Sequence, residues 1–146
     1  MKNKTVKIFC AIIYSITALA GFVFAAIYIF RPEFMPYHAV AVGKEWAEMS
    51  SENQVLILAL MRVGGGGWLA TSVGILLLLL IPFRTNKFWP YLGIPAIGLS
   101  ALIPTFSATL FVKLNSPATP PYLVAAILIV LLLITIVMSL IYKNRA

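Results

Sequence analysis

Four long apolar runs constrain this chain more than any other feature of its sequence. Their ranges are 8–30, 55–81, 89–112 and 122–142. A helix needs about 20 apolar residues to cross the hydrocarbon of a bilayer. With 62% hydrophobic and 10% charged residues, the chain lacks the polar exterior that a soluble domain needs. We therefore predict an all-α, multi-pass membrane protein, a four-transmembrane-helix bundle in one domain over residues 1–146.

The first run shares some features with a secretory signal peptide. Lys2, Lys4 and Lys7 precede it, and Ala18-Leu19-Ala20 is similar to a cleavage site. However, the run continues to Phe30, beyond the roughly 7–15 apolar residues of a signal peptide. We expect an uncleaved membrane anchor.

The basic residues predict the orientation, because cytoplasmic loops are enriched in lysine and arginine. With the N-terminus inside, the inner side carries seven: Lys2, Lys4, Lys7, Arg84, Lys87, Lys143 and Arg145. The outer loops carry three: Arg31, Lys44 and Lys113. All four acidic residues then fall in residues 31–54. We predict cytoplasmic N- and C-termini and a long first extracytoplasmic loop.

Local signals in this first loop predict where the second helix begins. The stretch "RPEFMPYHAV" contains two prolines and cannot be helical throughout, whereas "GKEWAEMS" is compatible with a short interfacial helix. Ser51 and Gln54 have the spacing of a capping box, with Ser51 as the N-cap. We expect the second helix to begin outside the hydrocarbon, near Ser51.

The second run contains Arg62, followed closely by Gly64, Gly65, Gly66 and Gly67. Arg62 is expected about 10 Å inside the hydrocarbon. A charge at the bilayer centre costs about 2.5–3.5 kcal/mol, and each large aliphatic residue offsets about 0.3–0.6 kcal/mol. The other apolar residues of the run therefore allow insertion, but the guanidinium still needs a partner.

The glycines predict close helix packing, because small residues let helix backbones approach each other in lipid. Gly65 and Gly66 share the face of Arg62, whereas Gly64, Gly67, Thr71 and Gly74 form a second stripe of small residues. A continuous packing helix is one interpretation of this pattern. The other is a local break in the helix that lines a cavity.

The third run supplies hydroxyl groups at a similar depth to Arg62. It contains Pro90, Pro95 and Pro104, so we expect a kinked helix in which Pro104 leaves the Ser100 carbonyl without its helical donor. We predict an outer-leaflet pocket around Arg62, with hydrogen bonds from Thr105, Ser107 and Thr109. The first loop would close over it with Glu33 and His38. In the alternative interpretation Arg62 extends towards the interface or pairs with Glu33 or another carboxylate of the loop.

Several classes of function are excluded by what the sequence lacks. The single histidine lies in a loop, which argues against haem ligation by helix histidines, and the single cysteine, Cys10, excludes dithiol chemistry. No acidic residue lies in a span, as a cation-coupled exporter would require. We expect no metal, no cofactor and no nucleic-acid partner.

The whole chain resembles small bacterial integral membrane proteins of unassigned function. The stretches that carry the resemblance are "FRPEFMPYH" and "LALMRVGGGGWLA". It implies four spans and a bacterial inner (plasma) membrane location, and it implies no activity.

Three functions remain open. The leading hypothesis is a non-enzymatic protein that binds a lipid, or a small anionic or polar ligand, with Arg62 holding the anionic group. The second is a structural or accessory subunit, in which the small-residue stripe contacts another chain or a second copy. The third is an enzyme acting on a lipid or isoprenoid, with Glu33 and His38 as acid and base.

Overall fold

The computed structural model describes residues 4–85 and 87–143, which are helical and contain no strand. The elements are α1 (Lys4–Phe30), α2 (Pro36–Val42), the 3-10 turn η1 (Trp46–Glu48), α3 (Ser51–Leu80), α4 (Pro90–Asn115) and α5 (Tyr122–Lys143). Of these described helices, α1, α3, α4 and α5 are long and apolar enough to cross a membrane. Lys2 and Arg145, two of the basic residues that predict the orientation in the membrane, lie outside the described residues.

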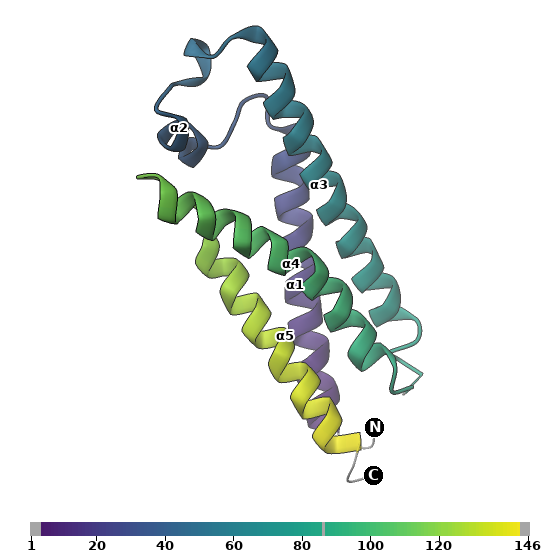
Figure 1. The fold of residues 1–146 in the computed structure, drawn as a ribbon. Helices are drawn as coiled ribbons and strands as arrows, with labels where there is room; N and C mark the ends of the chain where they lie inside the picture. Colours follow the sequence, from purple (N-terminus) through teal and green to yellow (C-terminus); the bar gives the residue numbers. More distant parts are fainter. Residues whose placement is uncertain (1–3, 86, 144–146) are drawn as a thin grey trace.

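The four long helices form two antiparallel pairs, with α1 beside α3 and α4 beside α5 (Figure 1). One end of the bundle holds the start of α1, the end of α5 and the connection between α3 and α4, and we call it the turn end. The other end carries α2 and is called the α2 end. Towards the α2 end, α4 and α5 lean away from α3 (Figure 1).

A stripe of small and aromatic side chains on α1 forms the centre of the core. Val6, Cys10, Tyr14 and Ala18 recur every four residues and are buried. Gly65 of α3 allows the close approach of the two helices. A Cβ atom at Gly65 would lie 2.8 Å from the Ile29 side chain and 3.1 Å from the Ala25 carbonyl oxygen.

The start of α3 differs by one residue from the predicted capping box. Ser50, rather than Ser51, is the N-cap, and its hydroxyl accepts a 3.4 Å hydrogen bond from the Asn53 amide. Ser50 has an extended backbone that aims its hydroxyl at the helix end, whereas Ser51 is already helical. The side-chain amide of Gln54 instead donates to the Trp46 carbonyl at 2.8 Å. The predicted interfacial helix is the single turn η1.

Helix α3 is continuous through its four glycines, so the local break is not observed. The first connection contains α2, which begins at Pro36 and ends at Val42, with Gly43 as its C-cap. Gly43 has φ +68°, a left-handed conformation that glycine adopts without strain. Helix α4 contains both Pro95 and Pro104 without interruption of its assigned range.

Candidate functional site

A cavity of about 510 Å³ lies in the half of the bundle near α2, between α1, α3 and α4. Its volume is in the range usual for small-ligand sites, about 300–1,000 Å³. The lining residues are Phe24, Tyr28, Tyr37, His38, Gly64, Gly67, Trp68, Thr71, Ser100, Ala101, Pro104, Thr105, Ala108, Thr109 and Val112. None of these carries a formal charge when His38 is neutral.

The α3 wall of the cavity is built on the glycine run. Gly64, Gly67, Trp68 and Thr71 are three or four residues apart and so share one face of the helix. A Cβ atom at Gly67 would meet nothing within 4 Å, and one at Gly64 would meet only the Tyr28 ring, at 3.9 Å. The missing side chains of these two glycines therefore contribute directly to the open space.

The α4 wall carries hydroxyl groups that bond back to their own helix. Thr105 donates to the Ala101 carbonyl at 2.8 Å, and Thr109 donates to the Thr105 carbonyl at 2.8 Å. On α3, Thr71 donates to the Gly67 carbonyl at 2.9 Å. Each hydroxyl hydrogen is therefore engaged, while the oxygen keeps a lone pair that can accept a bond from a ligand.

A proline adds one more acceptor to the α4 wall. Pro104 has no amide hydrogen, so it cannot donate the helical bond to the Ser100 carbonyl four residues earlier. The Ser100 hydroxyl donates to Ile97 at 2.8 Å. Both Ser100 and Pro104 line the cavity. The Ser100 carbonyl thus lacks its helical donor, as the sequence predicted from Pro104, and it belongs to a residue that lines the cavity.

Helix α2 contributes Tyr37 and His38 to the wall of the cavity. The hydroxyls of Tyr37, on α2, and Tyr28, on α1, are hydrogen-bonded to each other at 2.5 Å. Burial raises the pKa of the Tyr37 hydroxyl above its ordinary value of 10, and the bond from Tyr28 offsets part of this. The pair is therefore protonated at neutral pH and has one hydroxyl hydrogen left to donate.

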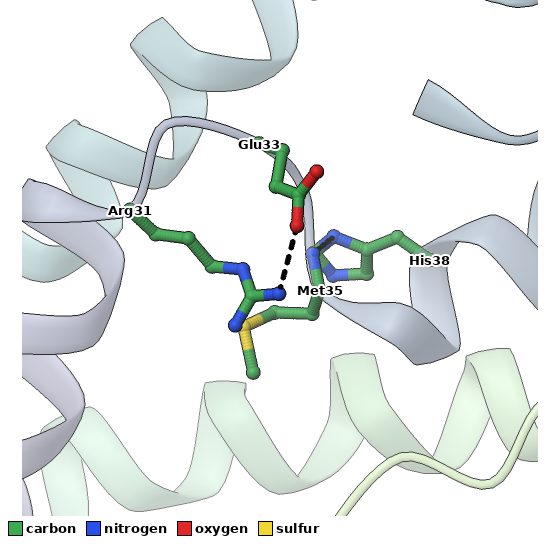
Figure 2. Close-up of polar contacts among 4 residues, drawn as sticks. All are labelled: Arg31, Glu33, Met35 and His38. Carbon is green, nitrogen blue, oxygen red and sulfur yellow. Dashed lines mark hydrogen bonds and ion pairs between the residues drawn. The ribbon is translucent and has the colours of Figure 1, made fainter. Parts of the chain in front are cut away.

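His38 is held in one tautomer by the start of α2. Its Nδ1 accepts a 3.4 Å bond from the Met35 amide, so the neutral ring carries its proton on Nε2 (Figure 2). Burial lowers the pKa of His38 below its ordinary value of 6.5. The ring is therefore neutral at pH 7, with Nε2–H as a donor.

Arg62 does not line this cavity. It is exposed, and at about 100° per residue it lies roughly 120–180° around α3 from Gly64, Gly67, Trp68 and Thr71. The predicted grouping of Arg62 with the hydroxyls of the third span is therefore not observed. Glu33 pairs with Arg31 at 3.2 Å (Figure 2) rather than with Arg62.

The structure brings some of the other predicted residues together and separates the rest. His38, Thr105, Thr109, Gly64, Gly67 and Thr71 meet at the cavity. Ser107 is exposed, because it is two residues, or about 200°, from both threonines. Gly66 faces open space, and a Cβ atom at Gly74 would lie 4.0 Å from the Ile97 side chain of α4, an ordinary contact distance.

Sequence reasoning missed the aromatic part of the lining. Phe24 and Tyr28 stack on α1 with ring centroids 4.0 Å apart, and Phe24 lies 5.5 Å from the Trp68 ring. The four-residue spacing of Phe24 and Tyr28 was an available signal that they share a face. No signal in the sequence indicated that Tyr37 would meet Tyr28.

Among the described residues, no group of three or more His, Cys, Asp or Glu side chains is placed to hold a metal ion. The cavity combines an aromatic and apolar surface with uncharged hydrogen-bond acceptors and donors. Comparison of the chain with protein-family models, with curated proteins and with solved structures found no match.

Proposed function

We propose that this multi-pass membrane protein binds a neutral, hydroxyl-bearing lipid in the cavity at the α2 end, without catalysing a reaction. The observation that carries the proposal is the surplus of uncharged acceptors at the wall. They are the oxygens of Thr71, Thr105, Thr109 and Ser100, together with the Ser100 carbonyl.

The charge of the lining supports a neutral ligand. An anionic headgroup in an apolar site needs a cation to compensate for its lost hydration. Arg62 is the one basic residue within the apolar runs, and it faces away from the cavity. A ligand such as a fatty-acid anion would therefore remain uncompensated.

The hydrogen-bonding inventory supports a hydroxyl headgroup. An alcohol can donate to the threonine oxygens or to the Ser100 carbonyl, and it can accept from His38 Nε2–H or the tyrosine pair. The aromatic surface of Phe24, Tyr28 and Trp68 suits an acyl chain or a fused ring. An ester that lacks a hydroxyl group could not donate a hydrogen bond, so the acceptors of the cavity wall would remain without a partner.

The distribution of basic residues supports one orientation of the cavity in the membrane. The excess of basic residues at the turn end favours a cytoplasmic location for that end. The cavity then lies in the outer half of the membrane, beneath a first extracytoplasmic loop that contains α2. By resemblance, the membrane is the bacterial inner membrane.

The test uses Trp68 as a reporter in the cavity. The chain has three tryptophans, so replacing Trp46 and Trp89 by Phe leaves only Trp68. We expect a brominated monoacylglycerol to quench its fluorescence, and we expect monooleoylglycerol to compete about fivefold better than methyl oleate, the advantage of about one net hydrogen bond.

Paired variants make this test specific. Gly67→Leu fills the cavity and should abolish quenching, whereas Gly66→Leu adds the same atoms on a face with open space and should not. Arg62→Gln should leave affinity unchanged. Equal quenching of both glycine variants, or tight binding of oleate that Arg62→Gln removes, would contradict the proposal.

A second candidate function rests on the exposed face of α3. Arg62 lies there with Ala59 and Gly66, three and four residues away, and all three are exposed. This combination favours contact with another membrane chain, or a second copy, that supplies an anion to Arg62. A cysteine at Gly66 that crosslinks to nothing in native membranes would argue against this function.

A further inference from the structure

A second cavity, of about 550 Å³, lies at the turn end between the start of α1 and the end of α3. Lys4, Lys7 and Arg84 line it, together with Ile8, Ala11, Ser15, Leu79, Leu80 and Phe83. It shares no residue with the cavity at the α2 end. The proposed function does not use it.

The three basic residues lie together at one edge of this groove. Lys4 is the first residue of α1, and Arg84 follows the end of α3 by four residues. The Lys7 ammonium donates to the Arg84 carbonyl at 3.4 Å and lies 5.8 Å from the centre of the Phe83 ring. These contacts hold the Lys7 charge next to the Arg84 backbone.

The acidic side chains of the chain lie at the opposite end of the bundle from this groove. The four glutamates of the chain, Glu33, Glu45, Glu48 and Glu52, all lie in the connection before α3 or in its first turn, at the α2 end. The charges of Lys4 and Arg84 at the groove are therefore suited to an external anion.

The order of groups along the groove matches the order of groups in a phospholipid. The cations lie at the helix ends, where a membrane surface would be, and the lining continues along α1 through Ile8 and Ala11 towards Ser15. An arginine and two lysines can bond phosphate oxygens, while the aliphatic lining accommodates an acyl chain. We infer that this groove binds an anionic phospholipid, with its phosphate at Lys4, Lys7 and Arg84.

Native mass spectrometry with phosphatidylglycerol and phosphatidylcholine of identical chains tests the charge requirement. We expect wild type to retain phosphatidylglycerol preferentially. Lys4→Gln with Arg84→Gln should reduce this preference by about fivefold for each charge removed. The matched control is Lys87→Gln with Lys143→Gln, which removes two charges from the same end but outside the groove. An equal loss in both pairs, or no preference in wild type, would overturn the inference.

A second pair of variants separates a phospholipid from free phosphate. Ala11→Leu narrows the aliphatic part of the groove and leaves its cations in place, so lipid retention should fall severalfold. Ala26→Leu adds the same atoms at an exposed position of α1 and should have no effect. If millimolar inorganic phosphate displaces the lipid while Ala11→Leu leaves retention unchanged, the site is a phosphate site and the lipid assignment is wrong.

Discussion

Helix α4 contains two internal prolines whose surroundings differ completely. Pro95 cannot donate to the Tyr91 carbonyl, and Pro104 cannot donate to the Ser100 carbonyl. At the first proline, the Tyr14 hydroxyl of α1 donates to Tyr91 at 3.1 Å and replaces the missing bond. At the second, Ser100 and Pro104 line the cavity. The same backbone defect is repaired from a neighbouring helix in one place and belongs to a cavity-lining residue in the other.

The difference follows from how closely the helices pack at the two ends. Near the turn end, Tyr14, Tyr91 and Ile94 are fully buried, and the Cys10 thiol contacts the Ser139 hydroxyl at 3.8 Å. Near the α2 end, the helices diverge (Figure 1), and the hydroxyls of Thr105 and Thr109 bond only within α4. The Tyr14 hydroxyl thus links two helices where the helices are close, whereas the hydroxyls of Thr105 and Thr109 line a cavity where the helices separate.

Truncating one side chain at each end of α4 gives the largest expected effect. Ile94→Ala removes a fully buried side chain and should lower the free energy of unfolding by about 2–5 kcal/mol. Leu110→Ala, at the α2 end, removes a half-buried one and should cost less than half as much. Reversible unfolding in mixed micelles measures both. Equal losses would contradict the difference in packing.

The repair at Pro95 can be tested by a double-mutant cycle. Tyr14→Phe leaves the Tyr91 carbonyl without its donor and should cost about 1–3 kcal/mol. Pro95→Ala restores a backbone donor to the same carbonyl, so the cost of Tyr14→Phe should shrink in that background. If the two substitutions are additive, the tyrosine does not compensate for the proline.

The corresponding change at the second proline should act on binding rather than on stability. Pro104→Ala supplies an amide hydrogen to the Ser100 carbonyl and removes that acceptor from the cavity wall. We expect the affinity for monooleoylglycerol, followed by Trp68 quenching, to fall about fivefold. Pro95→Ala is the matched control and should leave affinity unchanged, since Pro95 does not line the cavity. Equal losses would mean that α4 geometry, not the carbonyl, determines affinity.

The sequence predicted the four long helices and the Ser100 acceptor because both follow from local rules. Apolar runs specify which segments can span a bilayer, and a proline always removes the donor to the carbonyl four residues earlier. The repair by Tyr14 was not predicted, because it depends on which residue of α1 lies beside Tyr91. Such contacts are set by packing between segments 77 residues apart.

The rotation of α3 was the main limit of the sequence argument. In a membrane helix the outward face is apolar as well, so the pattern of Leu, Ile and Val does not indicate which side meets the bundle. The glycines gave two possible faces. The structure directs Gly65 to α1 and Gly64 and Gly67 to the cavity, which turns Arg62 outward. Depth along the helix was therefore a poor guide to which groups share a site.

The smallest expected effect concerns the docking of α2 over the cavity and its dependence on pH. Burial lowers the pKa of His38 in the folded protein below its ordinary value of 6.5, so the unfolded segment binds more protons as the pH falls. Protonation also removes the Nδ1 acceptor used by the Met35 amide. Docking should therefore be unaffected above pH 6.5 and should weaken progressively as the pH falls below it.

Trp46 can report this change, because its ring packs on Phe34 with centroids 5.0 Å apart, next to His38. With Trp68 and Trp89 replaced by Phe, its emission should shift to longer wavelength between pH 6.5 and 5, as the segment loosens and water reaches the indole. In His38→Gln, which cannot titrate, the emission should stay constant over the same range. A shift that persists in His38→Gln would assign the pH dependence to another group and would leave the α2 closure independent of this histidine.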